Sequence, residues 1–320
     1  MGLGAFIGVG KSLETALQRI ELVEHLGYES AYVTDIAARD SLTTLMAYAS
    51  RSERLRLGTG VMPIYSRTPV ATARSFATLD EFSGGRAVIG LGVSHRPVVE
   101  AWYGQTIEKP LRQMREYVEI VRAILRGEDP PQGETFRTAF HFMGFEPRPD
   151  IPIYIAGLAP GMLRLAGEIA DGVVLWLCNP EYIRNTVVPS VAEGRAKAGK
   201  PAEGFDIVAA VPSAVTSDPG PARAQLRSEL IPYFSLPFYR KMIELSGYGD
   251  DIRLRRERTR RHLGRLHLHP RRDRQRGRGR GVGAPLRRER RVVAMPWRDL
   301  QNGCRRDVRS ARRLFGIAHG

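Results

Sequence analysis

The sequence predicts an α/β protein built on a parallel β-sheet. Between residues 3 and 245, strand-like segments alternate with helix-like segments, and right-handed crossovers then place successive strands side by side and parallel. The roughly seven β/α units fit a (β/α)8 TIM-type barrel that is one strand short. A doubly wound open sheet is the alternative, because periodicity alone does not separate the two folds.

Each element follows from its local composition. The first strand is expected at residues 3–9, and the first helix at residues 13–26, with Ser12 as its cap and Gly27 at its end. The other strands are expected at residues 30–34, 55–61, 87–91, 153–156, 173–177 and 207–215. The other helices are expected at residues 41–50, 69–82, 110–125, 162–169, 181–198, 221–230 and 238–245, and a loop-rich stretch at residues 127–150.

The composition, 42% hydrophobic and 26% charged, is that of a chain that buries a core. No apolar run is long enough to cross a bilayer, and the apolar residues 2–10 lack the basic start and cleavage site of a secretory signal. We therefore expect a cytoplasmic protein. Cys178 and Cys304 are far apart in the sequence, which excludes a disulfide scaffold and a zinc finger. The pair His267 and His269 is discounted, and no metal site is expected.

The charge divides the chain into two segments. The net charge is +15, but residues 1–251 hold 26 Lys and Arg against 29 Asp and Glu, whereas residues 252–320 hold 23 basic residues against 5 acidic ones. Every basic residue of the second segment is Arg, and all five lysines precede it. We therefore expect a barrel at residues 1–251 and an irregular, Arg-rich tail at residues 252–320.

Three interpretations of the tail stay open. It is an arm that binds nucleic acid through phosphates, a disordered tail, or the product of a reading-frame shift in a GC-rich gene, where shifted codons yield Arg, Gly and Pro in excess. The absence of Lys favours the frame shift, since a selected basic arm would usually mix Lys with Arg. A nucleic-acid partner is then not expected, and the barrel would lack its normal final strand and helix.

Candidate site residues follow the predicted strands, because a parallel barrel carries its chemistry at the strands' carboxyl ends. Asp35 follows the second strand and accepts hydrogen bonds either from a ligand or only from neighbouring backbone. Thr59 and Gly60 lie at the end of the third strand, where glycine permits close backbone approach or an unusual turn. Ser94 and His95 follow the fourth strand, either as a ligand-facing pair or as exposed loop residues.

Two glycine-rich loops are further candidates. The run Gly90-Leu91-Gly92 resembles the start of a dinucleotide fingerprint but lacks the third glycine, so it is a weak indication. The loop at residues 156–161 either points backbone N–H groups at an anion such as a cofactor phosphate or forms a plain tight turn.

At these residues the chain resembles the bacterial luciferase-like superfamily, and in particular its coenzyme F420-dependent oxidoreductases related to methylenetetrahydromethanopterin reductase. One carrying segment, at residues 55–104, is LRLGTGVMPIYSRTPVATARSFATLDEFSGGRAVIGLGVSHRPVVEAWYG. The other, at residues 151–175, is IPIYIAGLAPGMLRLAGEIADGVVL. The LD-x-x-SGGR pattern is especially specific, and the resemblance covers residues 2–250.

The resemblance implies a (β/α)8 barrel with a flavin or deazaflavin lying across its carboxyl-terminal mouth. It implies a cis peptide bond between Gly60 and Val61, at the end of the third strand beside Thr59, which forms a bulge behind the cofactor ring. Ser94 and His95 match the loop that lines the cofactor pocket in the family.

The same resemblance assigns Gly157 and Leu158 to the loop whose backbone donors meet the phosphate-bearing tail of the cofactor. Asp35 falls at the acidic or polar position after the second strand. Many relatives carry an Asp-His pair there, and this chain has Ile36 in place of the His, which puts His-based proton transfer at that point in doubt. Catalytic residues stay unassigned, with Asp35 and His95 as the candidates.

The implied function is hydride transfer between coenzyme F420 and an unidentified small organic substrate. F420 is favoured because the resemblance is to the reductase branch. The alternatives are an FMN-dependent luciferase-like monooxygenase and an inactive barrel with a basic nucleic-acid-binding tail. The expected partner is a small molecule and not a membrane, and a homodimer stays open.

Overall fold

The computed structural model describes residues 2–8, 12–216, 218–230, 233, 236–249 and 291–294. The chain divides into two compact units, Met1–Ala210 and Val211–Gly320. Apart from residues 291–294, the Arg-rich tail lies outside the described residues, so the expected lack of a regular final strand and helix there stays a prediction. In the part of the chain that the structure describes, no helix has both the length and the apolar character needed to span a membrane.

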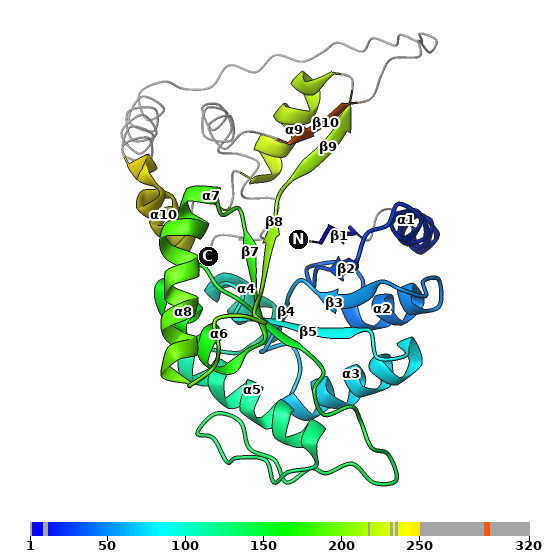
Figure 1. The fold of residues 1–320 in the computed structure, drawn as a ribbon, viewed down its shortest axis with the longest axis vertical. Coiled ribbons are helices and arrows are strands. Elements are labelled where there is room, and N and C mark those ends of the chain that lie inside the picture. The colour runs from blue at the N-terminus through cyan, green and yellow to red at the C-terminus, as the bar shows by residue number, and fades with distance from the viewer. Residues whose placement is uncertain are drawn as a thin grey trace, which may run out of the picture. The chain divides into compact units, whose positions relative to one another are not determined.

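The first unit is built on a parallel sheet that curves into a nearly closed α/β barrel (Figure 1). Its strands follow the order β1-β2-β3-β5-β6-β7-β8, with β4 paired to β5. The strands are β1 Gly4–Phe6, β2 Ser30–Val33, β3 Arg56–Thr59, β4 Met62–Pro63, β5 Ala87–Gly92, β6 Ile153–Ala156, β7 Gly172–Trp176 and β8 Asp206–Ala210. The barrel predicted from the sequence is confirmed.

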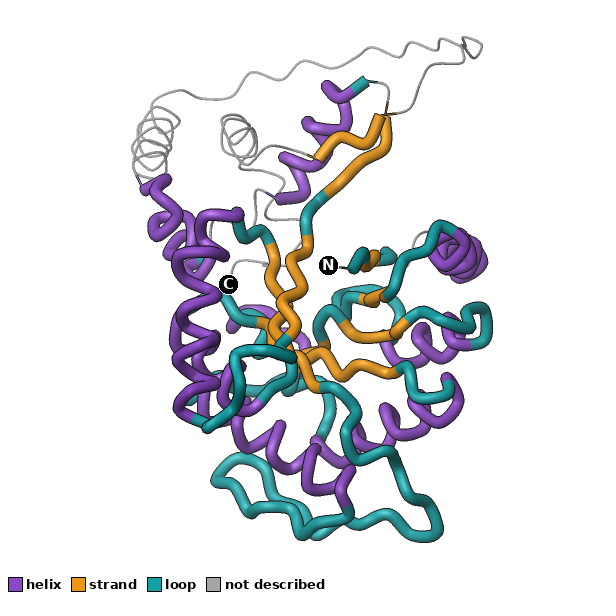
Figure 2. The backbone as a smooth tube through the Cα atoms, viewed as in Figure 1, coloured by secondary structure: helices purple, strands orange, loops and turns teal. Residues whose placement is uncertain are grey.

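Helices lie on the outside of these strands (Figure 2). They are α1 Leu13–His25, α2 Ser41–Ala49, α3 Pro69–Ser83, α4 Arg96–Tyr103, α5 Pro110–Arg126, α6 Pro160–Ile169, α7 Pro180–Tyr182 and α8 Val188–Lys197. Side-chain caps begin several of them: Ser12 accepts the Thr15 N–H at 3.1 Å, and Thr68 accepts the Ala71 N–H at 3.2 Å. In these two helices the polar residue before the first turn therefore fixes where the helix begins.

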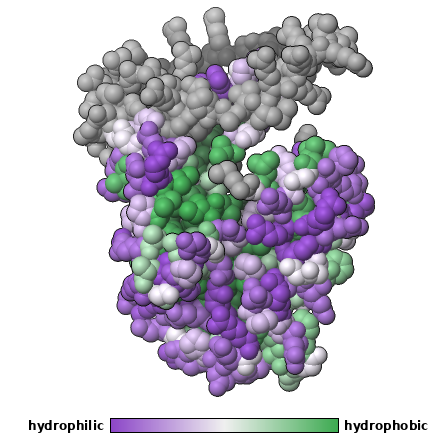
Figure 3. All heavy atoms as spheres, in the orientation of Figure 1, coloured by the Kyte–Doolittle hydropathy of each residue, from purple (hydrophilic) through white to green (hydrophobic). Residues whose placement is uncertain are grey.

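The interior of the barrel is apolar. Val88, Tyr154 and Val174 form a buried cluster, and the half-buried side chains of Phe6, Val61 and Val208 pack against it. Figure 3 shows apolar side chains gathered over β7 and β8 on the face drawn. These six side chains come from β1, β5, β6, β7, β8 and the end of β3, so the cluster joins strands from both ends of the sheet.

A polar cluster lies at the amino-terminal end of the same strands. Arg56 donates to Asp206 Oδ2 at 3.2 Å and to the Tyr154 hydroxyl at 3.3 Å. The Tyr154 hydroxyl also donates to Asp206. These bonds link β3, β6 and β8 across the barrel, so this end contributes to stability, as is usual for the face opposite the chemistry.

The structure corrects several expectations for single elements. The strand expected at residues 55–61 ends at Thr59, and β4 was not expected. The strand expected at residues 207–215 is divided into β8 and β9, Ser213–Thr216, because Pro212 has no N–H to donate to a ladder. The helix expected at residues 181–198 consists of three segments, because a π-helical segment, Ile183–Val187, lies between α7 and α8. Pro189 has no N–H and therefore removes one helical hydrogen bond at the start of α8. Helix α4 was not expected.

The second unit contains the remaining elements of the described part of the chain. They are β9, α9 Pro219–Leu230, α10 Pro237–Ile243, the π-helical segment Glu244–Tyr248 and β10 Arg291–Ala294. Strand β10 pairs antiparallel with β9, with Arg291 opposite Thr216. The predicted helices at residues 221–230 and 238–245 therefore exist with shifted ends.

Candidate active site

The carboxyl ends of β2, β3, β5 and β6 meet at one end of the barrel, because these strands are parallel neighbours in the sheet. Every residue that the sequence nominated for the site lies at or directly after one of these ends. They are Asp35, Thr59, Gly60, Val61, Ser94, His95, Gly157 and Leu158. The structure thus brings them to a common mouth, while their part in binding stays a prediction.

The floor of this mouth is apolar and closely packed. The peptide bond between Gly60 and Val61 is cis, as the family resemblance implies. A Cβ atom on Gly60 would lie 2.3 Å from Phe6 Cε1, and one on Gly92 would lie 2.6 Å from Val61 Cγ2 and 3.4 Å from Ala156 Cβ. Glycine at positions 60 and 92 therefore allows Phe6, Val61 and Ala156 to come together.

Thr59 supports this floor within the sheet. Its side chain is 0% exposed. Its hydroxyl donates to the Gly90 carbonyl at 2.6 Å and accepts the Gly90 N–H at 3.1 Å. Thr59 therefore offers its polar atom to the neighbouring strand and not to a ligand. Gly90 is explained by this close approach and not by a dinucleotide fingerprint.

Asp35 lies half-buried directly after β2. The Ser41 hydroxyl, at the start of α2, donates to Asp35 Oδ2 at 2.9 Å. Burial raises the pKa of Asp35 above its ordinary value, with the charge of Asp40 adding to the rise and Ser41 and Arg67 opposing it. The carboxyl group is thus suited to hold and release a proton closer to neutral pH than an exposed Asp.

Tyr103, the last residue of α4, belongs to the same neighbourhood. Burial raises the pKa of its phenol, and the negative charge of Asp35 raises it further. Arg67, which lowers the pKa of Asp35, also forms an ion pair with Asp40, the cap of α2. Of this group, only Asp35 was nominated from the sequence. Its neighbours Ser41, Arg67 and Tyr103 belong to three other elements, and their proximity depends on the fold.

Ser94 and His95 form the connection from β5 to α4. Ser94 has a φ of 55°, in the left-handed region that side chains other than glycine rarely adopt. Leu177, directly after β7, has a φ of 62°. Such backbone conformations cluster at functional sites. Burial lowers the pKa of His95, so its imidazole is neutral at pH 7 and can both donate and accept a hydrogen bond.

The connection from β6 to α6 ends in an uncapped helix. The Gly157 N–H donates to the Val174 carbonyl at 3.3 Å, and the Tyr182 hydroxyl donates to the Leu158 carbonyl. Ala159 is the N-cap residue of α6, with no side-chain cap and no acidic residue in the first turn. Pro160 has no N–H, and the Met162 N–H donates to the Ala159 carbonyl at 3.0 Å. The Gly161 N–H is therefore the donor of the first turn that is left for an anion or water.

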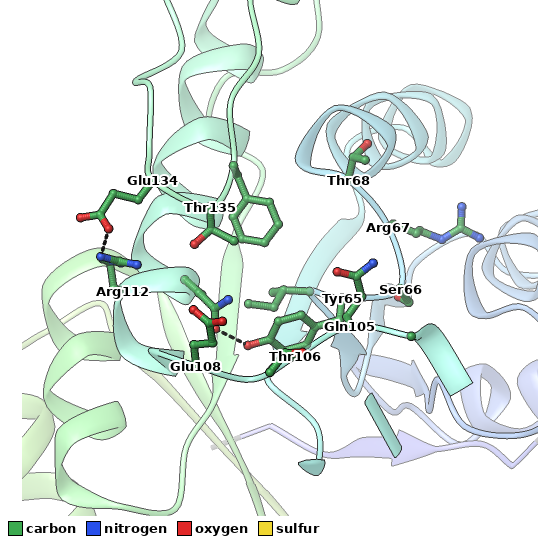
Figure 4. A pocket seen from close by; sticks show the side chains of 14 residues that line it. Tyr65, Ser66, Arg67, Thr68, Gln105, Thr106, Glu108, Arg112, Glu134 and Thr135 are labelled. Atoms are coloured by element: carbon green, nitrogen blue, oxygen red, sulfur yellow. Dashed lines mark hydrogen bonds and ion pairs between the residues drawn. The ribbon is translucent and has the colours of Figure 1, made fainter. Parts of the chain in front are cut away.

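A cavity of about 690 Å³ lies beside the mouth, lined by segments 64–68, 104–106 and 134–136 and the start of α5 (Figure 4). Tyr65 donates to Gln113 Oε1 at 2.7 Å, and Arg112 is paired with Glu134. Arg67 contributes to the lining as well. None of the residues nominated from the sequence lines this cavity.

Other chemistry is weakly represented in the described part of the chain. It contains no group of three or more His, Cys, Asp and Glu residues that could hold a metal ion. Cys178 is buried, and burial raises the pKa of its thiol to about 12. The thiolate that a nucleophilic cysteine requires is therefore absent near neutral pH.

Curated relatives carry the names of reductases and oxidoreductases. The chain is 37% identical over 210 residues to the 5,10-methylenetetrahydromethanopterin reductase of Archaeoglobus fulgidus. The matched region covers 65% of this chain and 62% of the reductase. It is 34% identical over 230 residues to a putative coenzyme F420-dependent oxidoreductase of Mycobacterium tuberculosis, covering 67% of this chain and 66% of the relative. The chain therefore spans just under two thirds of the length of these relatives.

Solved structures share the barrel. The coenzyme F420-dependent tetrahydromethanopterin reductase of Methanopyrus kandleri superposes with a TM-score of 0.65 at 26% identity, covering 73% of this chain and 72% of that one. A monooxygenase of Streptomyces bottropensis superposes with a TM-score of 0.63 at 23% identity, covering 81% and 83%, and shows likeness of fold alone. The model of the luciferase-like monooxygenase family matches residues 2–286. With most of its length matched and its strand ends arranged as described, the chain belongs to the luciferase-like monooxygenase family.

Proposed function

We propose that this protein is an oxidoreductase that transfers a hydride between coenzyme F420 and a small organic substrate at the carboxyl-terminal mouth of the barrel. The observation that carries the proposal is the 34% identity, over 230 residues, with a relative named for its dependence on F420. The reductase of Methanopyrus kandleri, also named for F420, supports it through a shared fold at 26% identity.

The residues at the mouth fit such a cofactor. The apolar floor of Phe6, Val61 and Ala156 suits one face of a planar ring. The uncapped start of α6 at Ala159 suits the phosphate of a cofactor tail, since the Gly161 N–H and the helix dipole favour an anion there. A ring on the floor and a phosphate at α6 would use Val61, Leu158 and the turn between Ser94 and His95.

When bound, F420 would supply or accept two electrons as a hydride. The residues of the chain would orient the reactants, exclude water and exchange the proton. The floor residues orient the reacting partners and exclude water from one side. Asp35, whose pKa burial raises, exchanges the proton that accompanies hydride transfer to a carbon–heteroatom double bond. His95 stays neutral and provides a hydrogen bond to the polar group of the substrate.

An FMN-dependent monooxygenase is the second candidate. It is favoured by the description of the matching family as luciferase-like monooxygenases. FMN also carries a phosphate that the start of α6 would accommodate, so the fit of that helix does not separate the two cofactors. We further infer that the protein works in the cytoplasm on a small molecule and without a membrane or nucleic-acid partner.

Equilibrium titrations of the purified chain with F420 and with FMN, followed by fluorescence, test the proposal. We expect saturable binding of F420 and weaker binding of FMN. Tighter binding of FMN would replace the proposal by the monooxygenase. Binding of neither, together with salt-sensitive binding of DNA, would favour the inactive barrel with a nucleic-acid-binding tail.

A further inference from the structure

Ser41 and Asp35 form a buried contact at the carboxyl end of β2. Ser41 is the first residue of α2, its side chain is 0% exposed, and its hydroxyl donates to Asp35 Oδ2 at 2.9 Å. The start of α2 is itself fixed, because Asp40 accepts the N–H and the hydroxyl of Thr43, both at 2.8 Å. The Ser41 hydroxyl is therefore held in place by the helix.

The groups around Asp35 come from three other elements. Asp40 precedes α2, Arg67 precedes α3, and Tyr103 ends α4; each interacts electrostatically with the Asp35 carboxyl group. Arg67 is occupied by its ion pair with Asp40. Among the described residues, the hydrogen bond shown to the Asp35 carboxyl group is that from Ser41, and it engages Oδ2. Oδ1 is left for a ligand.

We propose that Ser41 is a positioning residue for Asp35: its buried hydroxyl holds Oδ2, so that Oδ1 is the atom that exchanges a proton with a substrate bound at the mouth. This inference rests on the proposed function for the identity of that substrate site. The contact between the two side chains does not depend on which cofactor binds.

Removal of the hydroxyl has a directional consequence. A hydrogen bond from Ser41 favours the charged carboxylate, so Ser41→Ala is expected to raise the pKa of Asp35 by about one unit. Ser41→Thr keeps the hydroxyl and is expected to leave the pKa near that of the native protein. Ser41→Cys keeps the size but donates weakly, so an intermediate value is expected. A role in packing alone would not produce this order.

The test is a pH titration of the full chain, with the aspartate carboxyl carbons labelled with ¹³C and followed by NMR. Asp35→Asn identifies the Asp35 resonance. Thr43→Val is the matched control, because it removes a hydroxyl from the same helical turn that serves Asp40 and not Asp35. We expect Ser41→Ala to raise the Asp35 midpoint and Thr43→Val to leave it unchanged. An unchanged midpoint in Ser41→Ala would overturn the proposal.

Two further measurements keep the outcome decisive. If Ser41→Ala does not fold, an unchanged Asp35 midpoint in Ser41→Cys overturns the proposal in its place. Fluorescence titration with F420 is run on the native protein in parallel. Failure of F420 to bind contradicts the proposed function, whereas the order of midpoints among the Ser41 variants decides the positioning role separately.

Discussion

Thr59 and Gly90 are joined twice across β3 and β5, with the Thr59 hydroxyl donating to the Gly90 carbonyl at 2.6 Å and accepting the Gly90 N–H at 3.1 Å. A Cβ atom on Gly90 would lie 1.8 Å from the Thr59 carbonyl oxygen. The contact between Thr59 and Gly90 thus holds together the two strands that lead into the mouth. The turn at Gly60 and Val61 begins directly after Thr59.

Loss of the Thr59 hydroxyl is expected to weaken the fold. Thr59→Val keeps the shape but leaves two buried backbone groups of Gly90 without this partner, which costs about 1–3 kcal/mol. Urea unfolding measures the change. Thr59→Ser retains the hydroxyl and is the control, so it should stay closer to the native protein. A Thr59→Val variant as stable as the native protein would show that the hydroxyl contributes nothing to stability and would contradict this account.

Two substitutions that add a cap to α6 are expected to have the same effect on stability but different effects on the affinity for F420. Ala159 has the extended backbone of an N-cap residue, with φ of −87° and ψ of 146°, so Ala159→Asp and Ala159→Asn should both stabilise the helix by about 1 kcal/mol. The carboxylate of Ala159→Asp would also repel a phosphate. We expect weaker binding of F420 in Ala159→Asp than in Ala159→Asn. Equal affinities of the two variants for F420, measured by fluorescence titration, would contradict the placement of the cofactor phosphate at the start of α6.

Stability is expected to fall in acid through Glu24. Its carboxylate accepts the N–H groups of Glu53, Arg54 and Leu55 at distances between 2.7 and 3.2 Å. Burial by itself raises the pKa of Glu24, but these bonds and the charge of Arg54 outweigh it, so the pKa lies below its ordinary value of 4.5. The stabilisation is therefore complete above pH 4.5 and is lost as the pH falls through the lowered value.

The variant Glu24→Gln provides the measurement for this residue. At pH 7 it should be less stable than the native protein by about 1–2 kcal/mol. The difference should shrink in denaturant unfolding experiments as the pH is lowered below 4.5, because the native carboxylate then becomes protonated. A difference that stays constant with pH would show that the charge of Glu24 plays no part.

Most of the barrel could be predicted because its signals are local. Apolar runs, the cap Ser12 and the glycine that follows the first helix, Gly27, mark the elements within a few residues. Helix α4 was missed because its eight residues carry only two buried side chains, Val98 and Val99, too few for a periodic pattern. The strand expected at residues 207–215 is divided at Pro212. The sequence prediction missed this division because the apolar residues on both sides of Pro212 resemble one continuous strand.

The site was predicted in part, since position after a strand is readable from sequence but side-chain neighbours are not. Asp35 and His95 could be nominated from their places after strands. The partners of Asp35, Ser41 and Tyr103, come from other elements and depend on tertiary packing. Thr59 was nominated for binding, yet its hydroxyl serves Gly90, a contact that only the pairing of β3 with β5 creates.

The Arg-rich tail gives a prediction at the level of the gene. Within the described residues the strand path begins at β1 and ends at β8 without a pairing that closes it, and unpaired edges are costly in a barrel. We expect resequencing around codons 245–260 to reveal a frame shift. Restoration of the frame should raise the melting temperature and the affinity for F420. An unchanged gene sequence would instead favour a genuine arm or a disordered tail.

A crystal structure of the protein with F420 bound tests the central claim most directly. We expect the ring to lie against Val61 and Phe6 at the mouth of the barrel, with the phosphate at the start of α6 near Ala159. Density for F420 in the cavity lined by Tyr65 and Gln113, or no density at the mouth from crystals grown with saturating F420, would contradict the claim.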